Sequence, residues 1–251
     1  MGLSGLEQVR RPAAGWSLSL YPQAGEGGGC FVSSRPRVMP LRVGPAADPE
    51  RARAEAGRRA RARLRRYCAA NRLNRLGTLT YAGDGCFDPV QARRDVGVFM
   101  RELRCLLGEQ PRPYAWVPEW HKSHGLHLHF AVARYTKKSL IDQAWGHGFV
   151  HIKLLADVPV GAGSLGEARR AAGYLSKYVS KSFTDDRLPR RHRYDVAQGF
   201  QPAKVVLQGR SAGDVLGQAS RRIGCAPDRV WHSADTQGWQ GPPAVWASWG
   251  G

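Results

Sequence analysis

The sequence lacks both a long apolar run and a paired-cysteine motif. No stretch of the 251-residue chain approaches the roughly 18 consecutive apolar residues of a membrane span, so we expect no membrane partner. The five cysteines, at positions 30, 68, 86, 105 and 225, form no CxxC pair, which argues against a disulfide framework and a cysteine zinc site. The chain shows no basic segment followed by an apolar core near its start, so we expect a cytoplasmic location.

Acidic residues are also few. Only 20 Asp and Glu stand against 38 Lys and Arg, which gives a formal charge of +18. Because cationic side chains release counterions from phosphates, such an excess points to a polyanion partner, above all DNA. Of the basic residues 31 are Arg, in a chain rich in Ala and Gly. A GC-rich coding sequence explains part of that Arg count but not the shortage of acids.

The two ends of the chain carry no sustained periodicity. Residues 1–47 contain three consecutive glycines and scattered prolines, which predicts a disordered arm. Residues 184–251 are expected to form a basic C-terminal extension that is partly irregular. Its tryptophans could stack on bases, although a loosely packed tail is the preferred interpretation.

A basic helix is predicted over residues 48–75. Asp48-Pro49-Glu50 supplies an N-cap, a proline at the first helical position and an early acid. Eight arginines and one acid, Glu55, lie between Arg51 and Arg66. The helix is either a solvated basic face or a surface that tracks phosphates. In the second case the DNA contacts would come from Arg58, Arg59, Arg61, Arg65 and Arg66.

Residues 76–183 show a regular alternation of strand and helix patterns. Strands are predicted at 77–81, 114–120, 126–132 and 149–154, and helices at 89–107 and 137–145. This order predicts an α+β fold with a ferredoxin-like, RRM-like βαββαβ core and a central antiparallel sheet. In that topology the first and third strands are central, both helices cover one face, and the other face is open. A further helix from about Leu165 follows the fourth strand.

Alternation along the third strand places His127 and His129 on the open face, because the apolar residues between them point toward the helices. If the hairpin turns near Ser123, Glu119 lies opposite His127 at roughly 5 Å. Two imidazoles and a carboxylate on one face suit a divalent cation, and Thr78 and Thr80 on the first strand would line the same face. Two half-buried histidines without a metal are the simpler alternative.

His121 and His124, in the connecting loop, are rival metal ligands. A structural zinc site built from them is a minor alternative.

A tandem Tyr-x-Ser-Lys repeat lies within the helix that follows the fourth strand. At about 100° per residue, its phenols and ammoniums fall within an arc of roughly 100°. Tyrosines four residues apart often form a core stripe, but interleaved lysines favour a surface that faces phosphate. The residues concerned are Tyr174, Lys177, Tyr178 and Lys181.

Three motifs, in this order and spacing, resemble those of HUH endonucleases, the rolling-circle replication initiators of small plasmids and phages. They are Leu79-Thr80-Tyr81, Gly125-Leu126-His127-Leu128-His129 and the tandem repeat from Tyr174 to Lys181. The resemblance covers about residues 76–183, and the two tyrosines are similar to those of the two-tyrosine initiators of phages.

The resemblance implies a catalytic role for these residues. His127, His129 and Glu119 would bind Mg²⁺ or Mn²⁺, and a tyrosine would attack the scissile phosphate, Tyr174 first and Tyr178 second. The product would be a covalent 5′-phosphotyrosine link and a free 3′-hydroxyl that primes synthesis.

The implied partners are a single-stranded or hairpin DNA origin and a host polymerase. A host helicase is also implied, because no GxxxxGK[ST] loop follows Lys181. A basic loop that could grip DNA beside the nick is formed by Arg187, Arg190, Arg191 and Arg193, together with His192.

Other functions remain open at the level of sequence. A transposase or conjugative relaxase of the HUH class would share the chemistry. A non-catalytic RNA-binding module could use the same open sheet, although it would need aromatic residues where this strand carries histidine. A small zinc-bound regulatory protein is the third alternative.

Overall fold

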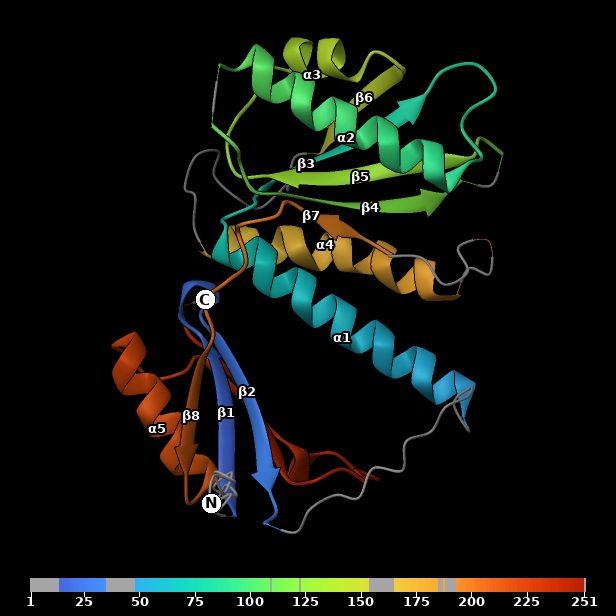
Figure 1. The fold of residues 1–251 in the computed structure, drawn as a ribbon. Helices are drawn as coiled ribbons and strands as arrows, with labels where there is room; N and C mark the ends of the chain where they lie inside the picture. Colours follow the sequence, from blue (N-terminus) through green and yellow to red (C-terminus); the bar gives the residue numbers. More distant parts are fainter. Residues whose placement is uncertain are drawn as a thin grey trace, which may run out of the picture. The chain divides into compact units, whose positions relative to one another are not determined.

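The computed structural model describes residues 14–34, 48–108, 110–121, 123–153, 165–184, 187 and 193–250. They fall into two compact units (Figure 1), one drawn from Met1–Gly44 and Lys204–Gly250 and the other from Pro45–Ala203. Within these described ranges no helix combines the length and the apolar character needed to cross a bilayer.

The larger unit contains the predicted βαββαβ core. Its sheet has the order β6-β3-β5-β4-β7, with every neighbouring pair antiparallel. The first and third strands of the motif are therefore central, and the ferredoxin-like prediction is confirmed. The core elements are β3 (Arg75–Tyr81), α2 (Pro89–Leu106), β4 (Tyr114–Trp120), β5 (Leu126–Val132), α3 (Lys138–Trp145) and β6 (Gly148–Lys153). The short β7 (Asp195–Val196) extends the sheet beside β4.

The hairpin between β4 and β5 has the register expected from a turn near Ser123. Glu119 pairs with His127, and the backbone N–H of His121 donates to the carbonyl of Gly125 at 2.7 Å. Gly125 has φ +71°, and a Cβ at this position would collide with the carbonyl of Cys86. A residue without a side chain is required where this turn meets the segment before α2.

The predicted core on one face of the sheet is present. Val96, Phe99 and Leu103 of α2 pack with Leu128 and Phe130 of β5, and α3 adds its own apolar residues. Alternation along β5 thus directs its leucines and phenylalanine toward α2 and α3 and its histidines toward the opposite face.

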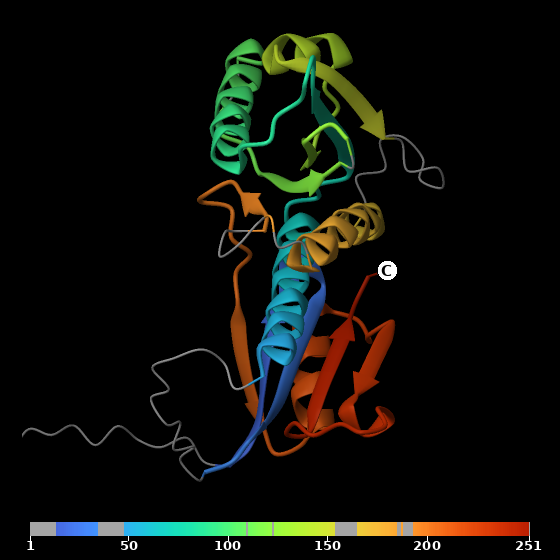
Figure 2. The same ribbon diagram turned by 90° about the vertical axis from the view of Figure 1, so that its right-hand side faces the viewer.

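The opposite face is not open, and this expectation was wrong. It is covered by α1 (Pro49–Ala70) and α4 (Leu165–Thr184), which lie on the other side of the sheet from α2 and α3 (Figures 1 and 2). Leu64 and Tyr67 of α1 share a buried cluster with Leu175 and Val179 of α4 and with Val117 of β4. The βαββαβ pattern gives no information about these flanking helices, whose apolar stripes close the face.

The helix predicted from Asp48 begins as expected. The Asp48 side chain accepts a hydrogen bond from the N–H of Arg51 at 2.9 Å, and Pro49 occupies the first turn. This cap satisfies one of the unpaired amide groups at the start of α1.

The smaller unit overturns the prediction of a disordered arm for its described residues. Residues of both chain ends form a second antiparallel sheet, with the order β8-β1-β2-β10-β9. Its elements are β1 (Gly15–Tyr21), the 3₁₀ turn Pro22–Ala24, β2 (Glu26–Val32), β8 (Val205–Gly209), α5 (Ala212–Ile223), β9 (Arg229–His232), the 3₁₀ turn Ser233–Asp235 and β10 (Ala244–Ser248).

The expected loose C-terminal tail is also wrong. Trp249 is fully buried and shares a core with Leu18 and Leu20 of β1 and Val215 of α5. The glycine run does not signal disorder here, because a Cβ at Gly29 would collide with the backbone of β1. Glycine allows the two strands to approach.

Candidate active site

Three neighbouring strands bring the candidate metal ligands onto one face. Thr80, His127 and Glu119 form one cross-strand row on β3, β5 and β4. Thr78 and His129 form the next row on the same face. Cross-strand partners lie about 5 Å apart, so these side chains reach one another.

His129 lies at the centre of the group and is 5% exposed. Its Nδ1 is 2.9 Å from the hydroxyl of Thr78, and its Nε2 is 2.7 Å from a carboxylate oxygen of Glu119. Both ring nitrogens are therefore held, which fixes the orientation of the imidazole. Of the two threonines predicted to line this face, Thr78 makes the side-chain contact with His129.

Glu119 bridges the histidine and a lysine. Its other carboxylate oxygen accepts a hydrogen bond from the ammonium of Lys181 at 2.6 Å. Burial of Glu119 opposes ionisation, but the hydrogen bonds from His129 and Lys181 outweigh it, and the pKa of Glu119 lies below its ordinary value. The residue is a carboxylate at neutral pH, as a metal ligand must be.

His127 is held differently from His129. Its Nε2 is buried and has no hydrogen-bond partner, and its ring stacks on His121 with centroids 4.7 Å apart. Burial lowers the pKa of His127, and the neighbouring His121 and His129 lower it further. The imidazole is thus neutral, with a nitrogen lone pair available for a ligand.

The rival loop histidines do not form a site of their own. His124 Nε2 contacts the carbonyl of Tyr81 at 2.9 Å, and His121 Nδ1 lies near Ser123 at 3.4 Å. The zinc site considered from the sequence thus gains no support from the geometry of His121 and His124.

The candidate nucleophiles reach this group from α4. Ala171, Leu175 and Val179 are buried against the sheet, and the turn of the helix places both tyrosines beside the histidines. The ring of Tyr178 stacks on His129 with centroids 3.6 Å apart and an interplanar angle of 16°. The ring of Tyr174 lies edge-on to His129 at 6.5 Å.

The two phenols are joined by a hydrogen bond. The hydroxyl of Tyr178 donates to the hydroxyl of Tyr174 at 2.5 Å. Burial raises the pKa of Tyr178, and the hydrogen bond to Tyr174 and the charge of Glu119 raise it further. Tyr178 is therefore held as a neutral donor, while Tyr174 occupies the acceptor position.

Three lysines lie near the phenols. Lys177 and Lys181 were predicted and lie 5.9 Å and 5.3 Å from the ring centroids of Tyr174 and Tyr178, respectively. Lys153 of β6 was missed, yet its ammonium is only 4.2 Å from the Tyr174 centroid. Alternation along β6 could have placed Lys153 on this face, but the pairing of β6 with β3 was needed to bring it near α4.

The residues present fit a divalent cation in chemistry but are not preassembled around one. Within the described ranges, no three His, Cys, Asp or Glu side chains are arranged to hold an ion. The fit rests on the buried, unpartnered Nε2 of His127 and on the bond that fixes Nδ1 of His129, since metal-binding histidines are typically held through their second nitrogen. A cation would replace the direct contact between Glu119 and His129.

The predicted DNA-binding arginines of α1 divide into two groups. Arg58 and Arg59 have side chains 62% and 73% exposed, and both lie near the carboxylate of Glu55. Arg61 instead donates to the hydroxyl of Ser180 at 2.9 Å, which ties α1 to α4.

The structure describes some, but not all, of the other arginines predicted to bind DNA. Arg65 and Arg66 are half-buried on α1, and the Nε of Arg66 donates to a carbonyl one turn back. Of the expected basic loop, Arg193 is half-buried, whereas Arg190 and Arg191 lie outside the described residues. Arg187 of the same predicted loop has its guanidinium 4.7 Å from the Trp120 ring centroid, near the end of β4.

The covered sheet bears on the non-catalytic alternative. A module that binds RNA on an open sheet presents aromatic side chains there, but here α4 occupies that face of β4 and β5. The geometry therefore favours a site between the sheet and α4 over a sheet surface that stacks bases.

Comparison with known proteins gives one match. Residues 74–183 match the family described as replication-associated protein ORF2/G2P. No curated protein and no solved structure matches the chain. The matched segment runs from β3 to α4, so it contains every residue of the group around His129, and it points to a role in the initiation of DNA replication.

Proposed function

We propose that this chain is an HUH-type rolling-circle replication initiator of the two-tyrosine type. In this function one DNA strand is nicked and rejoined through a 5′-phosphotyrosine intermediate. The proposal is carried by one observation, the packing of Tyr178 and Tyr174 of α4 against the His129–Glu119 pair of the central strands. A nucleophile and its charge-stabilising groups thus converge from separate elements.

Tyr174 is the first nucleophile in this proposal. A phenolate on Tyr174 would accept the hydrogen bond that Tyr178 already donates, and Lys153 and Lys177 would lie beside it. The pKa of Tyr178 is raised by burial and by the bond to Tyr174, which keeps this phenol protonated. The two phenols are therefore not equivalent, although their sequence contexts are almost the same.

The reaction balances without a cosubstrate. The Tyr174 oxygen attacks phosphorus, the bond from phosphorus to the 3′-oxygen breaks, and the leaving oxygen takes up a proton to become a 3′-hydroxyl. The phosphate stays on the 5′ strand as a tyrosine ester. Rejoining reverses these steps, since the ester conserves the phosphodiester energy.

His127, His129 and Glu119 would hold Mg²⁺ or Mn²⁺ in this function. The cation would withdraw charge from the scissile phosphate and orient it. Thr78 would fix the ring of His129, and Lys181 would keep Glu119 ionised through their 2.6 Å contact.

The proposed partners are a single-stranded or hairpin DNA origin, a host helicase that unwinds the duplex and a host polymerase that extends the 3′-hydroxyl. The excess of basic residues supports the DNA partner.

The test is incubation of the full chain with supercoiled candidate plasmid and Mn²⁺, followed by denaturing electrophoresis. We expect a protein–DNA adduct that survives denaturant and is absent from the Tyr174→Phe, Tyr178→Phe double variant. An adduct that persists in the double variant contradicts the proposal. A transposase or relaxase of the same class would form the same adduct but would differ in the DNA structure that it cleaves.

A further inference from the structure

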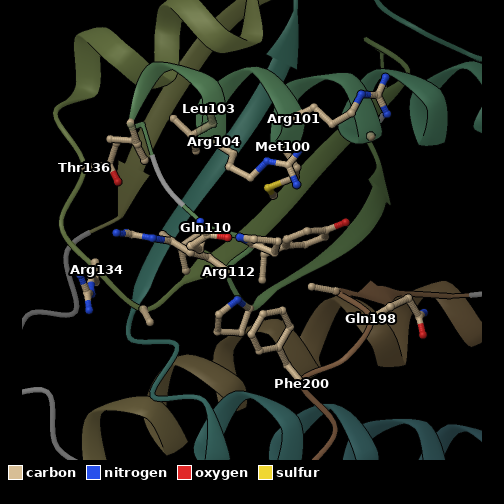
Figure 3. A pocket seen from close by; sticks show the side chains of 18 of the residues that line it. Met100, Arg101, Leu103, Arg104, Gln110, Arg112, Arg134, Thr136, Gln198 and Phe200 are labelled. Carbon is tan, nitrogen blue, oxygen red and sulfur yellow. The ribbon is translucent and has the colours of Figure 1, made fainter.

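The larger unit contains a cavity of about 960 Å³ that is separate from the tyrosine site (Figure 3). It lies beside the pair formed by Tyr114 at the start of β4 and Val132 at the end of β5. The pair of Glu119 and His127 is five residues farther along both strands. At about 3.4 Å per residue the two sites are roughly 17 Å apart along the strands.

Cationic groups surround the cavity. Arg101 and Arg104 come from α2, Arg112 precedes β4 and Arg134 follows β5. None of the described lining residues is acidic. Arg112 lies two residues before Tyr114 and Arg134 two residues after Val132, so both flank the same cross-strand pair. Desolvation lowers the pKa of Arg112, and the charge of Arg134 lowers it further. Like charges gathered around a concavity favour an anion between them.

The rest of the lining is apolar and aromatic. Met100 and Leu103 of α2 contribute to the cavity, and Phe200 lies on the side opposite α2 (Figure 3). Tyr114 and Phe200 both line the cavity and are half-buried. Aromatic rings next to cationic groups are the combination with which proteins hold single-stranded nucleic acids.

We propose that this cavity binds one nucleotide of single-stranded DNA outside the nick site, with its base against Phe200 and Tyr114 and its phosphate at Arg112 and Arg134. A ligand that is only an anion would leave the apolar half unused, and an apolar ligand would make no use of the arginines in the lining. The cavity volume lies within the usual range of ligand sites, about 300–1,000 Å³. The inference rests on the proposed function, because it assigns the cavity to the same DNA strand.

The first experiment measures binding of the full chain to a fluorescent oligo(dT) of about 16 nucleotides over a range of salt concentrations. For the Arg112→Ala, Arg134→Ala variant we expect the slope of log affinity against log salt to become shallower by about 0.7, the value for one lost phosphate contact on a single strand. The matched control is Arg221→Ala, Arg222→Ala. It removes the same charge from exposed positions on α5 and should leave the slope unchanged.

The second experiment tests the base contact. Phe200→Ala should weaken oligo(dT) binding about fivefold or more at an unchanged salt slope, because one stacked base contributes at least about 1 kcal/mol. Phe200→Tyr keeps a ring and should restore affinity. Phe200 also packs against the buried cluster formed by α1, α4 and the sheet. The rescue by tyrosine therefore separates loss of stacking from a general loss of structure.

Two results would overturn the inference. The first is an equal salt slope for the Arg112→Ala, Arg134→Ala variant and its Arg221→Ala, Arg222→Ala control. The second is tight binding of free thymidine monophosphate while the affinity for oligo(dT) is unchanged in every cavity variant. Adduct formation is scored in the same proteins. A wild-type chain that forms no adduct refutes the nicking function, whereas adduct formation with equal salt slopes refutes only the cavity assignment.

Discussion

Replacing Tyr178 by phenylalanine removes one hydroxyl and keeps the ring that stacks on His129. That hydroxyl donates to Tyr174 at 2.5 Å, so it would stabilise the phenolate from which attack occurs. A hydrogen bond to a charged group contributes about 1.5–3 kcal/mol. At 1.36 kcal/mol per tenfold in rate, the first cleavage should slow by about 10- to 150-fold. Tyr174→Phe removes the nucleophile itself and should cost about a thousandfold or more.

The assay is single-turnover cleavage of a labelled oligonucleotide that the wild-type protein nicks, with the covalent adduct followed by denaturing gel. Tyr178→Phe should form the adduct slowly but to the same final extent, and should then fail in the second transfer that ends a replication round. A wild-type rate of first cleavage in Tyr178→Phe would refute the proposed role of its hydroxyl. Faster cleavage by Tyr174→Phe than by Tyr178→Phe would reverse the assignment of the two phenols.

Three further variants test the metal site, the basic helix and the smaller unit. The His127→Ala, His129→Ala variant should lose Mn²⁺-dependent nicking. It should still largely retain DNA in a filter-binding assay, because arginines supply most of the affinity. Nicking in excess chelator would contradict this. Combined Arg58→Ala and Arg59→Ala should flatten the salt dependence of duplex binding by about 1.8, and an unchanged slope would make α1 a solvated face. Trp249→Ala should lower the free energy of unfolding by about 3–5 kcal/mol in urea titration, because the indole is fully buried; an unchanged midpoint would refute this packing.

The histidine and tryptophan variants each have a control in a comparable setting. His232→Ala removes a half-buried histidine of the smaller unit and should leave nicking intact. Trp239 is 44% exposed, so Trp239→Ala should cost much less stability than Trp249→Ala. Point substitutions are preferable to deletion of residues 1–75, because that deletion would also remove β1 and β2 from the second sheet.

The core strands and the face of the histidines could be predicted because the information is local. Alternation on β5 determines where His127 and His129 point, and a short turn determines that Glu119 pairs with His127. Both depend only on residues 114–132, and the structure has the predicted strand bounds there. The helix start at Asp48 is local in the same sense, since its cap lies within three residues.

The second sheet could not be predicted as a whole because two of its four strand pairings are distant in sequence. β1 pairs with β8, and β2 pairs with β10, more than 180 residues along the chain. Without those partners a glycine-rich segment and a tryptophan-rich tail each resemble irregular chain. The closed face of the first sheet was missed for the same reason, because its covering helices lie outside the βαββαβ pattern. That closure is also what brings Lys153 near Tyr174.

The most direct test of the proposed function is to map the attachment site of DNA by mass spectrometry. Trypsin cleaves after Arg170, Lys177 and Lys181, so Tyr174 and Tyr178 fall in different peptides, residues 171–177 and 178–181. After single-turnover cleavage and nuclease trimming, we expect the nucleotide mass on the peptide that contains Tyr174. Attachment at Tyr178 alone would contradict the assigned order of the phenols, and attachment at neither tyrosine would contradict the covalent mechanism.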